Sequence, residues 1–227
     1  MILGNVAVVV AARTLSSRLP GKALLPLQGM PMILFLLRRL RPLRRATLVF
    51  ATTTLAADDE LASLVATAGV PVFRGADADV VARYVAAAVR FGFDTMARVT
   101  GDCPFVDAEL VEHCLSQCMA ASPFDLATTK GRFPVGLDVE IFPSARLAAL
   151  HAAGSLSAEE REHLTLYFYN HRDVSTVHAL DPRPGWRCAD RHFTVDTRQD
   201  YDAARAIADR FAQPEFAIAD LLARAAA

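Results

Sequence analysis

A loop near the N-terminus carries side chains suited to binding phosphate groups. It follows an apolar run and contains three cations, Arg13, Arg18 and Lys22, together with the hydroxyls of Ser16 and Ser17. Guanidinium groups bind phosphate oxygens bidentately, lysine supplies a mobile charge, and backbone N–H groups add further donors. The alternative is a solvated surface loop with scattered charges. The residue types favour a triphosphate site over that alternative.

This loop matches neither of two common nucleotide-binding motifs. A Walker A loop requires glycine where Ser16 stands and serine or threonine where Ala23 stands. No G-x-G-x-x-G sequence occurs in the chain, which argues against a dinucleotide-binding domain. A triphosphate would therefore be held by a different arrangement of cations and backbone.

Two aspartates stand where a magnesium ion could be held. Asp102 and Asp196 each follow a predicted strand and precede a predicted helix. Magnesium prefers one or two carboxylates together with phosphate oxygens and water, so this pair would suffice. The competing roles are local. Asp102 could be a turn residue, while Asp196 could cap the following helix, for which Thr197 and Asp200 are alternatives; Asp107 is expected to cap its own helix.

Hydrophobic periodicity predicts an alternation of elements that would position these loops. Strands are expected at residues 6–12, 46–52, 70–73, 95–99 and 124–128, and helices at 31–40, 58–68, 78–91 and 107–119. Strands that alternate with helices indicate a parallel sheet with helices on both faces. Right-handed crossovers would place the carboxyl ends of the strands at one edge, where ligands bind in such sheets.

The pattern changes after Thr128. Residues 130–143 contain two glycines and two prolines and are predicted to form a hairpin or an excursion from the main sheet. Helices are then expected at 144–153, 157–171 and 200–211, and strands at 175–180 and 192–195. We see no internal repeat and no linker of low complexity. The prediction is one α/β domain over residues 1–227, in which 130–180 forms an acceptor-binding or dimerisation excursion.

Composition limits the classes of function. The chain has 227 residues, of which 53% are hydrophobic and 22% charged, and its net charge is -1. These values describe a globular protein without the basic excess of nucleic-acid-binding proteins. No basic segment precedes the N-terminal apolar run, which argues against a signal peptide, and no stretch is long enough to span a membrane. We expect a cytoplasmic protein that binds neither nucleic acid nor membranes.

The four cysteines are consistent with a reducing compartment. They stand at positions 103, 114, 118 and 188 and form no C-x-x-C pair. Cys114 and Cys118 would share a helix face and could supply half of a zinc site. Two small core residues are the simpler interpretation.

Six short motifs occur in an order that resembles a known family. They are RTLSSRLPGKALLP (13–26), VFRG (72–75), TGDCP (100–104), GLDVE (136–140), REHLT (161–165) and TVDT (194–197). Each motif alone is weak. Together, across roughly residues 6–205, they resemble the SpsF-type branch of the cytidylyltransferases, relatives of the CMP-Kdo and CMP-sialate synthetases.

The resemblance implies a fold and an activity. The fold would be a Rossmann-like, mostly parallel sheet flanked by helices, of the GT-A nucleotidyltransferase type, and the protein would be a homodimer. The enzyme would couple CMP from CTP to a small acceptor, expected to be an acidic sugar, and Mg²⁺-dependent release of pyrophosphate would accompany the transfer.

The resemblance also implies roles for individual residues. Arg13, Arg18 and Lys22 would hold the phosphates as the catalytic cations, and Asp102 and Asp196 would ligate the metal. The residues expected around the nucleotide are Ala11, Ala12, Ser17, Ala51, Thr52, Thr53, Arg74, Gly75, Thr100 and Gly101. Those expected to face the acceptor are Glu140, Arg161, Glu162 and His163. His163 could act as a general base or simply position the substrate.

The sequence departs from the family pattern at two places. Thr14-Leu15 stands where Met-Gly is common, and leucine does not readily adopt the positive φ that glycine allows, so the loop path is expected to differ. Arg198 stands where proline commonly follows the last motif. It is expected to face solvent, the alternative being a contact with an anionic acceptor.

Three other functions stay open on the sequence. A GT-A-like glycosyltransferase would use a nucleotide sugar and a D-x-D-type metal motif. A degenerate nucleotide-binding partner would have no activity, although the joint presence of Arg18, Lys22, Asp102 and Asp196 argues against decay. The third alternative keeps cytidylyl transfer and changes the acceptor to a phosphonate or another small acid.

Overall fold

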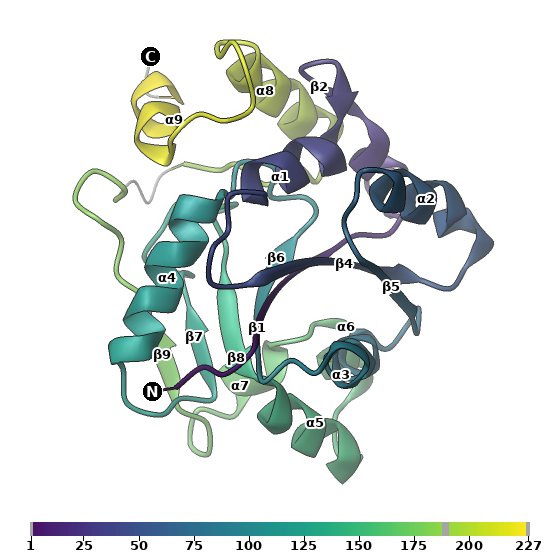
Figure 1. The fold of residues 1–227 in the computed structure, drawn as a ribbon, viewed down its shortest axis with the longest axis vertical. Coiled ribbons are helices and arrows are strands. Elements are labelled where there is room, and N and C mark those ends of the chain that lie inside the picture. Colours follow the sequence, from purple (N-terminus) through teal and green to yellow (C-terminus); the bar gives the residue numbers. More distant parts are fainter. Residues whose placement is uncertain (1, 188–190, 226–227) are drawn as a thin grey trace.

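The computed structural model describes residues 2–187 and 191–225, which form a seven-stranded sheet between two layers of helices (Figure 1). The order of strands is β5 (Val72–Gly75), β4 (Thr47–Thr53), β1 (Val6–Ala11), β6 (Thr95–Thr100), β8 (Glu140–Pro143), β7 (Leu126–Thr128) and β9 (Val177–Ala179). Every neighbouring pair is parallel except the two pairs that β8 makes. The predicted single-domain α/β fold with a mostly parallel sheet is confirmed.

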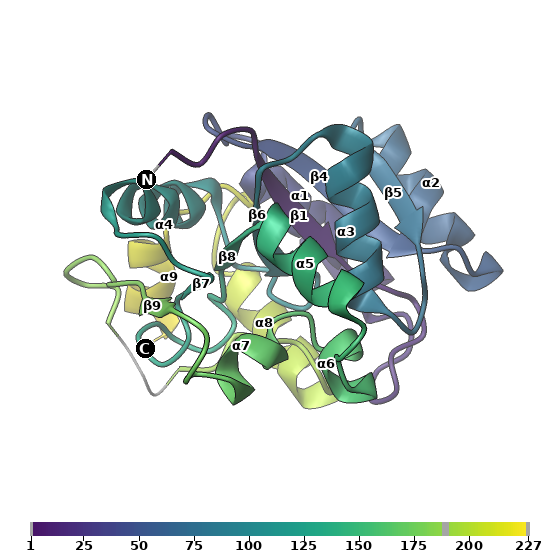
Figure 2. The same cartoon turned by 90° about the horizontal axis from the view of Figure 1, so that it is seen from below.

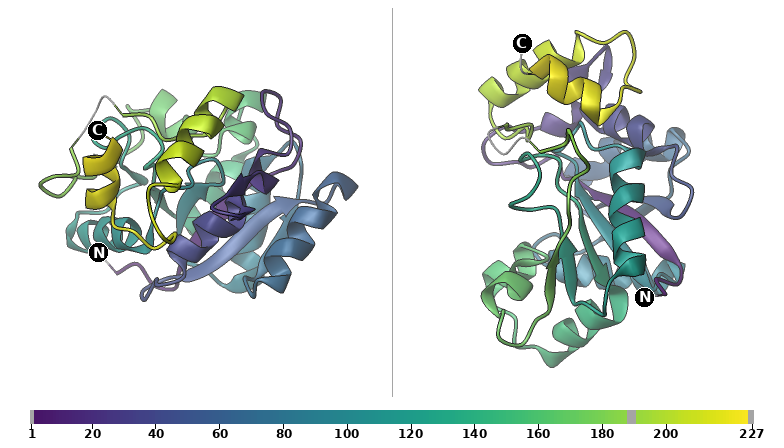
Figure 3. Two further views of the ribbon diagram at one scale, coloured as in Figure 1. Left: turned by 90° about the horizontal axis from the view of Figure 1, so that it is seen from above. Right: turned by 90° about the vertical axis from the view of Figure 1, so that its left-hand side faces the viewer.

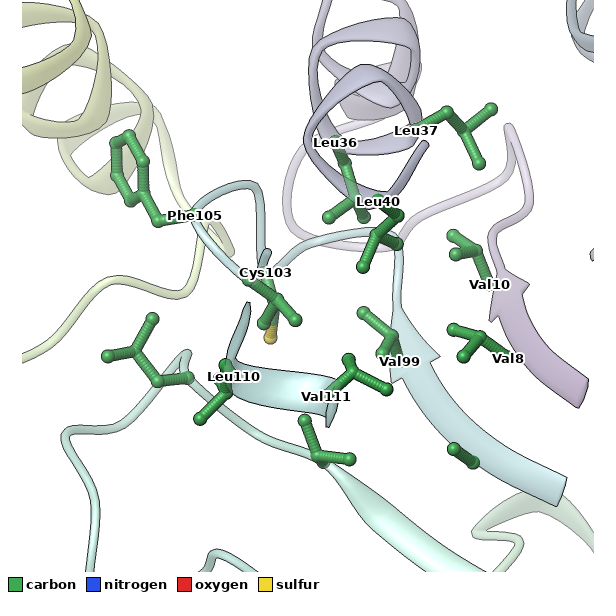
Figure 4. Close-up of a cluster of buried hydrophobic side chains, with 14 of the residues drawn as sticks. Val8, Val10, Leu36, Leu37, Leu40, Val99, Cys103, Phe105, Leu110 and Val111 are labelled. Atoms are coloured by element: carbon green, nitrogen blue, oxygen red, sulfur yellow. The ribbon is translucent and has the colours of Figure 1, made fainter. Parts of the chain in front are cut away.

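Apolar side chains from both faces of the sheet hold the helices in place. One layer contains α1 (Met32–Leu40), α2 (Asp59–Thr67), α4 (Ala108–Ala120), α8 (Arg198–Ala208) and α9 (Ile218–Ala225). The opposite layer contains α3 (Val80–Phe91), α5 (Ser144–Ala153), α6 (Ala158–Glu162) and α7 (Leu166–Asn170) (Figures 2 and 3). Figure 4 shows part of the first layer, in which helix and strand side chains meet: Val8, Val10, Leu36, Leu40, Val99, Leu110 and Val111.

The ends of the central strands meet at one edge of the sheet. The register pairs Ala11, the last residue of β1, with Ala51 of β4 and with Thr100 of β6. Strand β8 runs in the opposite direction, so its first residue, Glu140, lies at this same edge, opposite Arg98 of β6. Loops that follow β1 and β6 therefore emerge beside each other, as the parallel topology requires.

Two predicted elements in the second half of the chain are wrong in detail. Residues 140–143, predicted as part of a hairpin or an excursion, form β8 inside the main sheet. The single helix expected over 157–171 is divided into α6 and α7, because the residues between them turn inward. Leu164 packs in the core, and the Thr165 hydroxyl donates a hydrogen bond to Glu140 over 2.8 Å.

The strand expected at 192–195 does not form. Only an isolated bridge joins Val135 to His192, and the segment is held beside Gly136 instead. The Phe193 N–H donates to the Val135 carbonyl over 2.7 Å. Gly136 has φ +91°, and a Cβ there would overlap the backbone of residues 193–194, so this close approach requires glycine.

Smaller differences concern one strand, one short hairpin and the last helix. Strand β5 begins at Val72 and not at residue 70. The sequence did not predict α9 or the hairpin formed by β2 (Pro26–Leu27) and β3 (Met30–Pro31).

In the part of the chain that the structure describes, no helix is both long and apolar enough to cross a bilayer. Cys114 and Cys118 are buried in the core on α4, whereas Cys188 lies outside the described residues.

Candidate active site

A cavity of about 360 Å³ lies at the edge of the sheet where β1 and β6 end. The predicted site residues that line it are Ala11, Ala12, Arg13, Ser17, Arg18, Lys22, Thr100, Gly101, Asp102, Glu162, His163 and Asp196. Ser16 of the same loop also lines it, as do four residues that the sequence did not point to: Ala23, Val80, Arg83 and Arg98. The structure thus brings together loops that are far apart in the sequence.

The loop after β1 is closed by its own backbone. The N–H groups of Ser16 and Gly21 both donate to the Thr14 carbonyl, over 3.0 and 2.9 Å. Gln28 is the one non-glycine residue with positive φ among those described, so Leu15 has an ordinary backbone conformation. Its side chain is 59% exposed. The replacement of glycine by leucine therefore needs no strained backbone in this loop.

A buried carboxylate fastens the loop to β4. Asp58, 1% exposed, accepts hydrogen bonds from the Thr14 N–H over 2.7 Å and from the hydroxyls of Thr52 and Thr53. Burial alone would raise the pKa of Asp58, but these hydrogen bonds outweigh it and hold the pKa below its usual value. Thr52 and Thr53, expected to line the nucleotide, lie behind the loop and face this aspartate.

Gly101 allows the two loops to touch. Its N–H donates to the Ala11 carbonyl over 2.8 Å, and a Cβ at this position would lie 2.7 Å from the Cβ of Ala12. A larger residue would push the loop after β6 away from the loop after β1. The glycine therefore sets the position of Asp102, the next residue, beside the cationic loop.

Lys22 lies between the two aspartates predicted as metal ligands. Its Nζ donates to Asp102 Oδ2 and Asp196 Oδ1, both over 2.9 Å, and to the Val195 carbonyl over 2.8 Å. The other oxygen of Asp196 pairs with Arg18 over 3.0 Å. Burial alone would lower the pKa of the Lys22 ammonium, but the two carboxylates outweigh burial and raise it.

The competing local roles of the aspartates are taken by their neighbours. Thr197 is the N-cap of α8 and forms a capping box with Asp200, so the Asp196 side chain is free to turn towards Lys22. Asp107 caps α4, as predicted, by accepting from the Leu110 N–H over 2.8 Å. The Val195 N–H donates to the Asp102 carbonyl over 2.8 Å, which joins the two aspartate segments directly.

This donor set suits a hard divalent cation. Burial would raise the pKa of Asp102, but the charge of Lys22 and the hydrogen bonds around the carboxylate lower it, so the group is ionised at neutral pH. Asp102 and Asp196 converge on a single cationic atom, and each side chain is 25% exposed. Mg²⁺ usually takes one or two protein carboxylates together with phosphate oxygens and water, and two carboxylates converge here.

Four other predicted residues lie outside the cavity lining. Arg74 donates to the carbonyls of Thr53 and Leu55, both over 2.8 Å, and so supports the turn after β4. Arg161 pairs with Asp79 over 3.0 Å. Ala51 is fully buried inside β4, and Gly75 ends β5 against the ring of Phe73 and the stem of Arg83.

Glu140 belongs to a second cavity, of about 210 Å³, which adjoins the first. The two cavities share Arg98, Thr100 and Asp102 in their linings. Glu140 is buried and pairs with Arg98 over 2.6 Å and with Lys130 over 3.2 Å. It also accepts hydrogen bonds from the hydroxyls of Thr165 and Tyr169, over 2.8 Å each. Burial would raise its pKa, but these partners lower the pKa from 4.5 to about 2.

The low pKa of Glu140 predicts a stability difference that depends on pH. A depressed carboxylate pKa stabilises the fold above about pH 4.5, and this contribution is lost as the pH falls towards 2. Replacing the buried Glu140 with glutamine leaves the partly buried Arg98 without its carboxylate, so we expect a loss of about 3 kcal/mol at neutral pH. Urea unfolding at about pH 7 and pH 3 measures it, with exposed Glu60→Gln as the control. An unchanged difference between the native protein and Glu140→Gln at the two pH values would contradict the assignment.

The cations at the mouth of the first cavity have carboxylate partners too. Arg13 pairs with Glu162 over 3.1 Å and with Asp77 over 3.8 Å.

Arg198, which stands in place of the usual proline, pairs with Asp202 one turn along α8. Its side chain is 69% exposed, so it faces solvent as predicted. The departure at this position therefore does not reach the cavity.

Sequence reasoning missed Arg83 and Arg98 because neither stands in a recognisable motif. Arg83 lies in the first turns of α3 and donates to the carbonyls of Ala76 and Asp77 over 2.8 and 2.9 Å. Arg98 lies within β6, between the buried Ala97 and Val99. A charged residue in a buried helix or strand was the available signal, since such residues are rarely buried without partners.

The comparisons with known proteins concern the family and the fold. The chain matches the cytidylyltransferase family over residues 7–213. It is 29% identical to the spore coat polysaccharide biosynthesis protein SpsF of Bacillus subtilis, over 97% of this chain and 93% of that protein. Among solved structures, a cytidylyltransferase from Leptospira borgpetersenii superposes with a TM-score of 0.90 at 28% identity, covering 97% of this chain and 93% of the other.

A more distant structure shares the fold. CMP:2-keto-3-deoxy-manno-octonic acid synthetase, solved with CTP, has a TM-score of 0.70 at 18% identity and covers 91% of this chain and 99% of the other. At that identity the likeness concerns the fold alone. The family match covers most of the described residues, including both cavities. The chain therefore belongs to the cytidylyltransferase family of nucleotidyltransferase enzymes.

Proposed function

We propose that the protein transfers CMP from CTP to a small acceptor and releases pyrophosphate, with Mg²⁺ bound by Asp102 and Asp196. The observation that carries the proposal is Lys22, which is held by both aspartates within a cavity that also contains Arg13 and Arg18. Among the described residues lining this cavity are five cations and three carboxylates. The excess of positive charge suits a triphosphate.

In the proposed reaction an acceptor oxygen attacks the α-phosphorus of CTP. A bond forms between the acceptor oxygen and that phosphorus, the bond to the bridging oxygen breaks, and pyrophosphate leaves with the electron pair while the acceptor proton passes to solvent. The bound metal would supply charge stabilisation at the α-phosphate. Lys22 and Arg18 would leave their aspartate partners for the phosphates, and with Arg13 they would offset the charge that develops on the leaving group.

The nucleoside would lie towards α3. Val80 and Arg83 line the cavity on that side, close to the loop that Arg83 holds through the carbonyls of Ala76 and Asp77. The family resemblance implies that Ala51, Thr52, Thr53, Arg74 and Gly75 lie around the base and ribose. We propose that they act indirectly, by supporting the loops on either side of the nucleotide.

The test is pyrophosphate release from CTP, UTP, ATP and GTP in the presence of Mg²⁺ and a mixed panel of small acceptors. We expect release that requires both CTP and an acceptor, because the acceptor supplies the attacking oxygen. Protection of the protein by CTP against thermal unfolding, measured in parallel, reports binding without turnover. If CTP neither stabilises the protein nor yields pyrophosphate, the proposal fails, and a nucleotide-sugar-dependent transferase or a non-catalytic partner becomes the better account.

Two further features stay predictions. The family resemblance implies a homodimer, which the mass of the protein in solution would test. It also implies that residues 130–180 contribute to acceptor binding or to the dimer.

His163 lines the first cavity and is the C-cap residue of α6. We propose that it positions a substrate, since the break between α6 and α7 directs this part of the chain towards the nucleotide.

A further inference from the structure

The two adjoining cavities share a short stretch of their lining. Of the described residues, Arg98, Thr100 and Asp102 line both. With the nucleotide in the first cavity and the acceptor in the second, the new bond to phosphorus forms where the cavities meet. Arg98 is the cation that the two described linings have in common. It therefore lies beside the place where the α-phosphate would react.

The sheet fixes the position of Arg98. Side chains alternate between the faces of a strand, so Arg98 lies on the same face as Met96 and Thr100, which is the face that α3 covers. The residue is opposite Val9 of β1 and Glu140 of β8. Its side chain is 20% exposed and borders both cavities. A cation inside a central strand has less freedom of movement than the cations of the loop after β1.

The guanidinium group of Arg98 is held at one side and has donors left over. Its Nη1 donates to Glu140 Oε2 over 2.6 Å, and the Tyr84 hydroxyl lies beside the group. A guanidinium has five N–H donors in a rigid plane, so these two neighbours leave further donors for a ligand. Glu140 is buried and has three more partners of its own, which fix the anchor in turn.

The other cations of the first cavity are engaged differently. Lys22 and Arg18 pair with the aspartates that we assign to the metal, and both would have to leave them for the phosphates. Arg83 donates to the carbonyls of residues 76 and 77 and supports their loop. Arg98, in contrast, can keep Glu140 while it donates to a phosphate. A donor that need not move is preorganised, and preorganisation is what makes such donors effective in catalysis.

We propose that Arg98 is a catalytic residue that donates hydrogen bonds to a non-bridging oxygen of the α-phosphate and stabilises the charge on the transferred group. The inference rests on the proposed cytidylyl transfer and deepens it. The acceptor oxygen bonds to the α-phosphorus, and the bridging oxygen leaves with the electron pair as part of pyrophosphate. Arg98 keeps its protons throughout, while the acceptor proton passes to solvent. Glu140 is then a positioning residue that acts through Arg98.

The first test is phosphorus NMR of a bound, non-hydrolysable analogue, cytidine 5′-(α,β-methylene)triphosphate, with Mg²⁺ and without acceptor. In Arg98→Lys the lysine can pair with Glu140, but its single nitrogen cannot also span the distance to the phosphate as a guanidinium plane can. We expect the resonance of the α-phosphorus to shift from its native position and those of the β- and γ-phosphorus to stay. Arg205→Lys, at an exposed position of α8, is the matched control and should leave all three in place.

The second test separates turnover from binding. We expect Arg98→Lys to lower kcat by about tenfold or more, because the contact strengthens as charge develops on the transferred group. Affinity for the analogue, measured by calorimetry, should change by less than about twofold. Pyrophosphate release with each active acceptor of the panel gives kcat. The NMR measurement needs no acceptor and decides the question by itself.

A second pair of variants covers a failure of Arg98→Lys to fold. Glu140→Gln retains the arginine, whereas the double variant Arg98→Gln, Glu140→Gln replaces the ion pair with two amides that can bond to each other. The α-phosphorus resonance of the bound analogue should differ between the single and the double variant. A purely structural role of the ion pair would give the same resonance in both.

The outcomes separate this inference from the function beneath it. Failure of the analogue to bind to the native protein would count against cytidylyl transfer itself. Binding with an α-phosphorus resonance that Arg98→Lys leaves in place would overturn only the role of Arg98. So would equal shifts of all three resonances, which indicate a general disturbance of the site. A loss of turnover that a higher acceptor concentration restores would also overturn it, because Arg98 would then contact the acceptor and not the phosphate.

Discussion

Replacing Lys22 with alanine is expected to reduce turnover by about 100-fold or more, which places this residue at the centre of the site. The estimate follows from the usual cost of removing one preorganised charge that stabilises a developing anion. In the structure the Lys22 ammonium is held on three sides, by Asp102, Asp196 and the Val195 carbonyl. This geometry keeps the cation inside the cavity before any phosphate arrives, and from there it would pass from the aspartates to the phosphates.

The same variant makes a second prediction with the opposite sign. The Lys22 ammonium lies where the two carboxylates converge, and it therefore competes with a divalent cation for them. Without nucleotide, Lys22→Ala should bind Mn²⁺, measured by electron paramagnetic resonance, more tightly than the native protein does. A residue with a purely structural role would lower activity without improving metal binding.

The control for Lys22→Ala is Arg205→Ala, which removes a cation from an exposed position of α8. This control variant should retain native turnover and native Mn²⁺ affinity. Turnover of Lys22→Ala close to that of the native protein would remove Lys22 from the catalytic group. Equal losses in both variants would point to a general electrostatic effect.

Much of the fold could be predicted from hydrophobic periodicity, and the failures have physical causes. The strand over residues 6–12 and the helix over 78–91 are long and strongly patterned, and both form nearly as predicted. Residues 140–143 contain only two apolar residues between a glutamate and a proline, and they give no indication of where the strand inserts, because pairing with β6 depends on tertiary context. The break at 163–165 likewise depends on Glu140, which offers an acceptor to Thr165.

Some residues of the candidate site could likewise be predicted from the sequence, and others could not. Arg13, Lys22 and Asp102 stand in contiguous loops after strands, so their types and order indicated a phosphate and metal site directly, and they line one cavity. Thr52 and Thr53 stand equally close to a strand end, yet their side chains are fully buried and satisfied by Asp58. Periodicity cannot distinguish these cases, because the partner that satisfies both threonines, Asp58, lies beyond the strand and meets them only in the folded protein.

Replacing Asp102 with asparagine is expected to reduce turnover by about 100-fold or more, and the loss should depend on the metal concentration. The amide keeps the shape of the side chain and can still accept from Lys22, but it removes one of two charges that would hold the cation. We therefore expect a higher Mg²⁺ requirement and partial recovery of turnover at high Mg²⁺.

The comparison that decides the role of Asp102 is with Asp173→Asn and Asp196→Asn. Asp173 is exposed and outside both cavities, so its variant should behave as the native protein does. Asp196 shares Lys22 with Asp102, so its variant should show the same dependence on Mg²⁺, together with a freed Arg18. If Asp102→Asn lost turnover equally at all Mg²⁺ concentrations, Asp102 would be a positioning residue for Lys22 and not a metal ligand. Turnover near that of the native protein would remove Asp102 from the site, because no reaction at a triphosphate bound beside this carboxylate could be indifferent to its charge.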